Sequence, residues 1–418
     1  MKNNNFLMES KNIERDSFIW NMSGSMIMAF QSVILLMILT RTVGLIDAGI
    51  FTIAFANANL FMNIGKYGMR NFQVSDVKRQ FSFKEYLDSR WLTTGAMFLV
   101  SVVYVVVASI SKDYSFEKAM VIFWMCLFKI PDVIEDIYFG DYQKKGRLDV
   151  GSKAITIRMV ITLLLFGSIL IIWKDLLLAL VISTIVTSVI MIIFIKMTIT
   201  NFTESCKRSW KNVLLLLKQC FPLAAGAFLS FYIGNAPKYA IDSLLSDELQ
   251  ACYGFIAMPV FVIGLLNSFI FNPMLYKISK LWNEKKVKDF LMNVGLQVTL
   301  VFGITFVCII GAYLIGTPVL SWLYNTELAP YKTELLILLL GGGFLGLSGL
   351  LCAVITIIRC QNAVLGAYGM IAVFAYLLSN LIVSKYAMMG AAVLYTLLMG
   401  LLCLAFFGIF IFGVMKNK

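Results

Sequence analysis

Long runs of apolar residues recur along the whole chain, and they constrain its fold more than any other feature of the sequence. About twelve runs of roughly 20 mostly apolar residues can be placed between the two ends. Of the 418 residues, 60% are hydrophobic and only 14% are charged, far from the ~45–50% and ~25% of soluble domains. Runs of this length exceed the ~10 residues of a barrel strand, and lipid leaves backbone groups no partner outside a helix. The sequence therefore predicts an all-α polytopic membrane protein.

The expected transmembrane helices divide into two groups of six. Residues 1–17 are polar, carry charges of both signs and show no signal-peptide pattern, so we expect a cytoplasmic N-terminal segment. We predict an N-terminal bundle over 18–200, a basic cytoplasmic linker over 201–218 and a C-terminal bundle over 219–418. The spans are predicted at 18–40, 44–65, 91–111, 118–139, 155–173, 176–195, 219–241, 252–275, 291–315, 333–357, 365–384 and 388–413.

The distribution of Lys and Arg predicts the orientation. Most of the 35 basic residues fall at the termini and in the second, fourth, sixth and eighth connections, which places both termini in the cytoplasm. The net charge of +12 is thus spread over short loops beside an anionic leaflet rather than gathered on one face. Membrane lipids are expected partners, and nucleic acid is not.

The chemistry available to the chain is narrow. It has no His, and its eight Cys form no C-x-x-C pair, so we expect neither a metal site nor any other cofactor. A Ser–His or Cys–His nucleophile cannot form, and no Walker sequence is present. A membrane glycan polymerase could use carboxylates and Arg instead, but the outer loops are short; the longest runs from about Gly316 to Lys332. We therefore expect a protein that is not an enzyme, with a polymerase as an alternative.

Charged residues interrupt the predicted fourth span, where each is costly to bury and is by default a candidate site. Lys129, Asp132 and Asp136 follow one helical stripe, with Glu135 at its edge. One interpretation is a substrate site in a cavity. The other is a local Lys129–Asp132 pair, with the later acids at the cytoplasmic interface.

A second polar stripe lies in the predicted seventh span. It consists of residues within an arc of roughly 120° beyond Pro222, namely Tyr232, Asn235, Lys238, Tyr239 and Asp242. The alternative here is an interfacial Lys that extends toward water beside an aromatic belt. Arg41, at the outer end of the first span, could attract an anionic headgroup or could simply lie at the interface. The Gly-rich stretch from Gly341 to Gly349 favours close helix packing over a phosphate loop.

Three stretches resemble the polysaccharide transporter family, the Wzx-type flippases of lipid-linked oligosaccharides. They are LTRTVGLIDAGIFTIAFANANLFMNIGKYGMRNFQVSD at 39–76, YFGDYQKKGRLDVGSKAITIR at 138–158 and FPLAAGAFLSFYIGNAPKYAID at 221–242. The third, with Asn235, Pro237, Lys238 and Tyr239, is the most specific match. Asp47-Ala48-Gly49 departs from the Glu-Tyr-Gly that relatives often have at the first stretch.

The resemblance implies two six-helix bundles around a central cavity that opens alternately to each side, as in the multidrug/oligosaccharidyl-lipid/polysaccharide exporter superfamily. It implies a flippase in the bacterial inner membrane, with both termini cytoplasmic and an undecaprenyl-diphosphate-linked repeat unit of O-antigen, capsule or a related envelope polysaccharide as substrate. The polysaccharide polymerase machinery would be a possible partner. Arg41, Lys129 and Lys238 would then compensate the diphosphate, and Asp132, Asp136 and Asp242 would tune its release. A cation-coupled multidrug exporter of the same superfamily and a scramblase without directionality are further alternatives.

Overall fold

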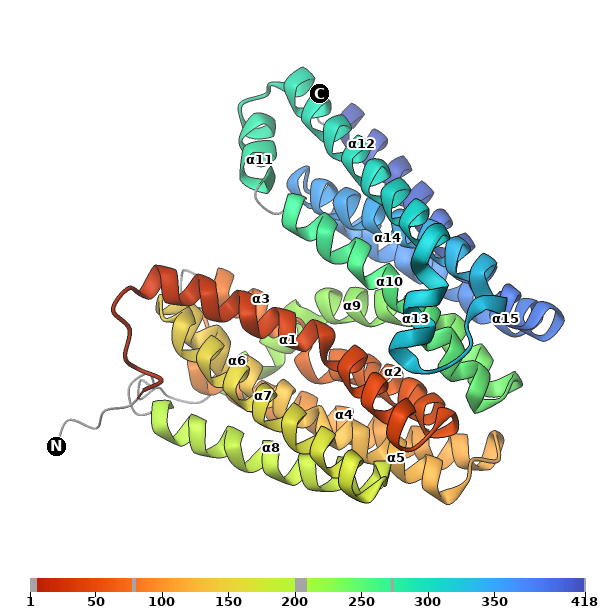
Figure 1. Cartoon of the computed structure of the whole chain (residues 1–418). Helices are drawn as coiled ribbons and strands as arrows, with labels where there is room; N and C mark the ends of the chain where they lie inside the picture. The colour runs from red at the N-terminus through yellow and green to blue at the C-terminus, as the bar shows by residue number, and fades with distance from the viewer. Residues whose placement is uncertain (1–5, 77–79, 200–208, 272–273, 417–418) are drawn as a thin grey trace. The chain divides into compact units, whose positions relative to one another are not determined.

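A computed structural model describes residues 6–76, 80–199, 209–271 and 274–416, and the regular structure in these ranges is helical throughout (Figure 1). The chain divides into two compact units, Met1–Phe228 and Leu229–Lys418. The predicted all-α polytopic fold is confirmed. Nine helices among the described residues are long and apolar enough to cross a bilayer.

The described part of the first unit contains eight complete helices. In chain order they are α1 (Ile13–Thr42), α2 (Leu45–Lys66), α3 (Met69–Ser75), α4 (Phe83–Ser111), α5 (Phe116–Phe128), α6 (Ile130–Lys144), α7 (Leu148–Trp173) and α8 (Leu176–Ile199). Within this unit α1 packs along α7, and α2 packs against both α4 and α5. The helix α9 (Trp210–Leu244) belongs to both units, because the division falls inside it.

The second unit continues from α9 into α10 (Asp247–Phe271), α11 (Leu275–Asn283) and α12 (Val287–Gly311). A π-helical turn η2 (Ala312–Gly316) joins α12 to α13 (Thr317–Tyr324), and a 3-10 turn η3 (Ala329–Tyr331) leads into α14 (Lys332–Ile357). The last helix, α15 (Gln361–Lys416), is broken at Ala387, whose φ of 46° and ψ of −128° are not helical. The two halves of α15 are the predicted eleventh and twelfth spans.

The layout of twelve spans agrees with the structure, with differences at particular places. The predicted fourth span is two helices, α5 and α6, which meet at Lys129 because Pro131 lacks the N–H that would continue the helix. The helix of the predicted third span, α4, begins at Phe83 rather than near residue 91, since Ser82 and Glu85 form a capping box there. Residues 210–218 of the predicted linker are the start of α9, while 201–208 lie outside the described residues. Hydropathy detects only the part of a helix that lies in lipid, so it shortens helices that extend into water.

The N-terminal segment, described from Phe6 onward, packs on the first unit. Leu7 is 2% exposed and belongs to a cluster of buried side chains from α3, α4, α6, α7, α8 and α9. The Arg147 guanidinium donates to the Met8 carbonyl at 2.7 Å, and the Lys153 ammonium donates to the Glu9 carbonyl. The segment is therefore held against the same end of the unit as the α6–α7 connection.

Glycines of α14 allow close helix packing, as the sequence indicates. A Cβ on Gly343 would lie 2.6 Å from the Thr305 methyl group of α12, whereas a Cβ on Gly349 would meet no atom within 4 Å. Gly343→Ala is therefore expected to destabilise the protein by about 1–3 kcal/mol through overpacking. Gly349→Ala is the matched control and should be neutral or stabilising, because alanine favours helix by ~1 kcal/mol. Thermal unfolding of both variants in the same detergent decides the matter; equal midpoints would contradict the packing role of Gly343.

Candidate functional site

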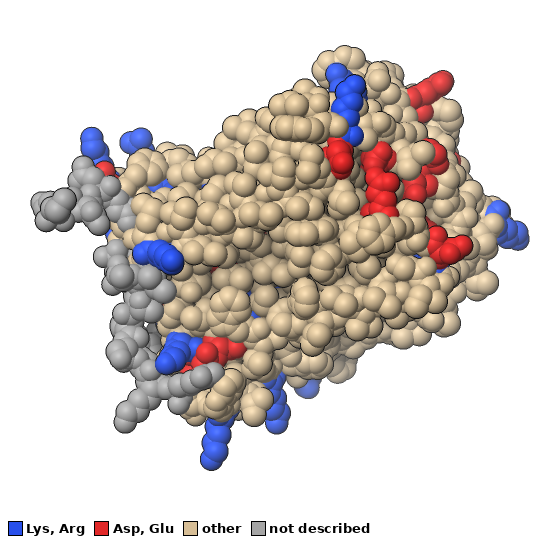
Figure 2. All heavy atoms as spheres, turned by 90° about the horizontal axis from the view of Figure 1, so that it is seen from below, with Lys and Arg blue, Asp and Glu red and all other residues tan. Residues whose placement is uncertain are grey.

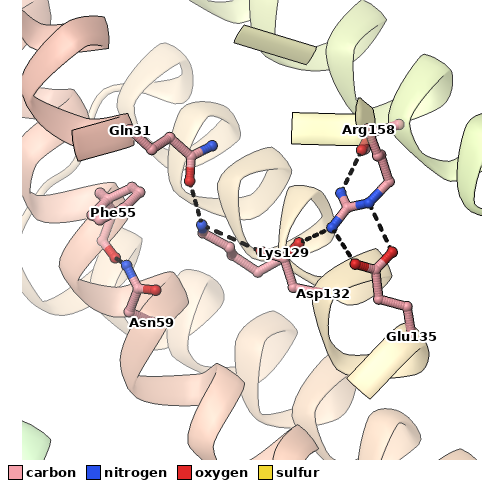
Figure 3. A network of polar contacts seen from close by, with 8 residues as sticks. Gln31, Phe55, Asn59, Lys129, Asp132, Glu135 and Arg158 are labelled. Atoms are coloured by element: carbon pink, nitrogen blue, oxygen red, sulfur yellow. Dashed lines mark hydrogen bonds and ion pairs between the residues drawn. The ribbon is translucent and has the colours of Figure 1, made fainter. Parts of the chain in front are cut away.

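Lys129 lies at the junction of α5 and α6 and is 3% exposed. Its ammonium donates to the Gln31 side-chain oxygen of α1 at 3.1 Å and lies 3.5 Å from the Asp132 carboxylate (Figure 3). It also lies 4.7 Å from the centre of the Phe55 ring of α2. The local Lys129–Asp132 pair that the sequence allowed is thus present, and it extends to two further helices.

Arg158 of α7 joins this pair to Glu135, and sequence reasoning missed it. Its guanidinium donates to Asp132 and makes two bonds to Glu135, at 2.8 and 2.9 Å. A fourth bond of 2.7 Å reaches the Thr187 hydroxyl of α8. The sequence had assigned Arg158 to a basic cytoplasmic connection, because it stands only three residues inside the predicted fifth span. In the structure α7 begins at Leu148, ten residues before Arg158, and Arg158 is only 2% exposed.

The residues of this network lie near the middle of their helices. Gln31, Lys129, Arg158 and Thr187 are each at least ten residues from either end of the helix or span that carries them, which is about 15 Å at 1.5 Å per residue. The network therefore lies inside the first unit, away from the ends of the helices that carry it. We call these residues with Asp132 and Glu135 the buried ion network.

The charges of the buried ion network balance. Two cations, Lys129 and Arg158, face two carboxylates, Asp132 and Glu135, within hydrogen-bond or ion-pair distance. Buried pairs of this kind are tolerated because each charge is compensated, and loss of one partner leaves an uncompensated charge. The network therefore clamps α1, α6, α7 and α8 together, and its cations are already occupied.

Asp136 does not belong to the buried ion network, although the sequence placed it on the same stripe. Its carboxylate lies 3.0 Å from the guanidinium of Arg90, which is fully buried on α4, and 3.9 Å from that of Arg70. Arg90 also donates to the Gly65 carbonyl at the end of α2, where the Thr93 hydroxyl donates as well. At 100° per residue, the step from Asp132 to Asp136 turns the side chain toward α4 instead of α7.

The second unit holds the other predicted stripe, on the part of α9 that follows Phe228. The rings of Tyr232 and Tyr239 are parallel within 13°, with centroids 5.9 Å apart. Both are partly accessible, as are Asn235 and Lys238 between them, whereas Ile233, Ala236 and Ala240 are buried. The structure thus brings four of the predicted residues to one accessible face of α9, which we call the α9 polar face. Asp242, one turn further, is buried.

Lys238 differs from Lys129 in having no counter-ion. In the described part of the second unit, no hydrogen bond or ion pair engages its ammonium, and Asp242 does not pair with it. The Asn235 amide donates to the Phe231 carbonyl of its own helix at 3.0 Å, which leaves its oxygen available as an acceptor. An uncompensated cation on the same helix face as two tyrosines suits an anion that carries hydroxyl groups.

Two other cations of the first unit are more accessible than Lys129. Arg41 is exposed in the last turn of α1, ten residues beyond Gln31, so the structure does not bring it to the buried ion network. Lys66 ends α2, and it shares a half-buried face of that helix with Asn59 and Asn63.

Comparison with known proteins gives distant relatives. No family model matches the chain. The capsular polysaccharide biosynthesis protein CapF of Staphylococcus aureus is 24% identical over 276 residues, which are 65% of this chain and 69% of CapF.

Solved structures match a larger share of the chain than CapF does. The lipid II flippase MurJ in an inward closed conformation matches 97% of this chain and 90% of its own with a TM-score of 0.71 and 14% identity. The MATE transporter VcmN of Vibrio cholerae in its bent form matches 97% and 98% with a TM-score of 0.63 and 12% identity. The chain has the transporter fold that MATE proteins and MurJ share.

Proposed function

We propose that this protein is a flippase of the bacterial inner membrane, not an enzyme, and that it moves undecaprenyl-diphosphate-linked oligosaccharide repeat units of O-antigen, capsule or a related polysaccharide. It would carry them from the cytoplasmic to the outer leaflet by alternating access of the two bundles to a central cavity. The observation that carries the proposal is the uncompensated Lys238 on the α9 polar face.

An anionic, sugar-bearing headgroup fits the α9 polar face. The Lys238 ammonium would neutralise a phosphate, which is costly to move through a low-dielectric region without a cation. The rings of Tyr232 and Tyr239 offer apolar surface to sugars, and the Tyr232 hydroxyl and the Asn235 oxygen can bond to sugar hydroxyls. We further propose that Arg41 attracts the diphosphate at the outer end of α1 and that Asp242 promotes its release.

The carboxylates and the lysine of the fourth span enter the proposal differently. Since Lys129, Asp132 and Asp136 already have partners of opposite charge, they act by keeping the first unit rigid while the units rock. The names of two similar proteins are consistent with the proposed role: MurJ is a lipid II flippase, and CapF is a capsular polysaccharide biosynthesis protein. A flippase in capsule assembly would also supply substrate to a polysaccharide polymerase.

A multidrug exporter is the second candidate, because MATE transporters share the fold. Such an exporter of organic cations requires an accessible carboxylate rather than an accessible ammonium. The deciding experiment is depletion of the protein, followed by mass spectrometry of the lipid-linked oligosaccharides and treatment of the cells with an external sugar-modifying enzyme. Accumulation of complete single repeat units shielded from that enzyme is expected. Single units that the enzyme reaches would indicate a polymerase, and an unchanged pool would favour the exporter.

The proposed orientation makes a separate prediction. In a variant without reactive native cysteines, a cysteine at Asn325 should react with an impermeant thiol reagent in intact cells, whereas one at Lys286 should not. Asn325 follows α13 and Lys286 precedes α12, and both side chains are exposed. A difference in their reaction with the reagent therefore reports only the side of the membrane on which each lies. Labelling of Lys286→Cys alone would reverse the topology.

A further inference from the structure

The connection from α11 to α12 carries the densest group of lysines in the second unit. Within residues 277–289, five lysines face two acids, which leaves a surplus of three positive charges. All five are exposed and are Lys277, Lys280, Lys285, Lys286 and Lys288. We call this stretch the basic segment. It is independent of the α9 polar face.

The apolar side of α11 fixes the basic segment in place. Ile278 is fully buried, and the Trp282 ring lies 4.8 Å from that of Phe290 on α12. The short helix packs against α12 and α14. Its lysines are therefore presented outward from a docked helix, so little conformational freedom is lost when they bind a ligand.

Two of the lysines are partly neutralised and three are not. Glu284 lies 3.7 Å from the Lys280 ammonium and 2.8 Å from that of Lys286. In the described structure Lys277, Lys285 and Lys288 have no acid within ion-pair distance. These three supply the free charge of the basic segment.

Lys285 and Lys288 lie where the apolar surface of α12 begins, and Lys277 lies in the first turn of α11, which packs against α12. Leu291 and Met292, one turn after Lys288, are 38% and 65% exposed, and exposed apolar residues continue along the helix at Leu296 and Leu300. Exposed apolar side chains on a membrane helix face lipid chains, so charges at its end lie at the level of the headgroups.

We propose that the basic segment binds the headgroups of anionic phospholipids. The charge surplus, its fixed presentation and its position beside lipid-facing residues match a phosphatidylglycerol surface rather than a soluble partner. A lysine close to an anionic membrane contributes about fivefold in binding. Loss of the three free lysines should therefore remove most of the preference for anionic lipid.

The test uses the full-length protein, purified in micelles that contain equal amounts of phosphatidylglycerol and phosphatidylcholine, and measures the lipids it retains by native mass spectrometry. The native protein should retain phosphatidylglycerol preferentially, and the triple variant Lys277→Gln, Lys285→Gln, Lys288→Gln should lose at least tenfold of that preference. The matched control removes three charges elsewhere, with Lys112→Gln, Lys174→Gln and Lys385→Gln, and should retain it.

Three outcomes would overturn the proposal. They are an unchanged preference in the triple variant, an equal loss in the control, and displacement of phosphatidylglycerol by millimolar inorganic phosphate, which would indicate a site for free anions. Because the three lysines are exposed, folding should be unaffected, and circular dichroism with thermal unfolding checks it.

Discussion

Replacing Lys238 by glutamine is expected to lower transport of the lipid-linked oligosaccharide about tenfold to a hundredfold, with abundance and thermal stability close to those of the native protein. A hydrogen bond between charged groups contributes about 1.5–3 kcal/mol, which corresponds to this loss of affinity for the headgroup. Stability should hold because Lys238 has no counter-ion, so its removal leaves no buried charge without a partner. Transport is measured in cells by the fraction of repeat units that an external sugar-modifying enzyme reaches.

Two control variants are compared with Lys238→Gln. Lys238→Arg keeps the positive charge and should retain most of the transport. Lys218→Gln removes an exposed lysine near the start of the same helix and should behave as the native protein. Full transport in Lys238→Gln would show that the headgroup binds elsewhere and would refute the role of the α9 polar face.

Unlike Lys238→Gln, Arg158→Gln is expected to destabilise the protein. The free energy of unfolding should fall by about 3–5 kcal/mol. The buried guanidinium donates to Asp132, Glu135 and Thr187. Glutamine cannot compensate Glu135, whose carboxylate would then remain buried beside a neutral side chain. Thermal unfolding in detergent and the yield of folded protein measure the effect.

The double variant Arg158→Met, Glu135→Gln tests the cause. It removes one acid together with the cation and leaves Asp132 paired with Lys129, so it should recover much of the stability, because buried ion networks can be replaced by neutral groups at little cost. Arg359→Gln, at an exposed residue after α14, is the control for loss of one arginine. If Arg158→Gln unfolds at the native temperature, the buried ion network does not clamp the first unit.

The positions of the helices were predictable from hydropathy, because a segment that crosses a bilayer must be apolar and helical. Runs of about 20 apolar residues must become helices, so the sequence predicted the all-α fold and the layout of spans. The break at Lys129 was not predicted, although Pro131 two residues later was its signal. The start of α4 at Phe83 also had a local signal, the capping pair Ser82 and Glu85.

The candidate sites were predictable only in part, because a polar stripe on one helix does not show which side chains of neighbouring helices face it. Helical periodicity alone placed Tyr232, Asn235, Lys238 and Tyr239 on one face of α9, since 100° per residue determines the direction of each side chain. The same periodicity grouped Lys129, Asp132 and Asp136. The structure keeps Lys129 with Asp132 but separates Asp136 from them, because α7 supplies Arg158 to Asp132 while α4 supplies Arg90 to Asp136.

The sequence by itself therefore determined which segments are helices in lipid and which polar residues share a helix face, since both follow from hydropathy and from the geometry of a single helix. Only the tertiary structure decided which cations are compensated. Lys129 and Lys238 look alike in the sequence, each a lysine within an apolar span. Asp132, one turn after Lys129, pairs with it, whereas Asp242, one turn after Lys238, does not pair with Lys238. Packing also brings the Gln31 oxygen of α1 and the Arg158 guanidinium of α7 to the first pair, because the surroundings of an ammonium depend on helices remote in the chain.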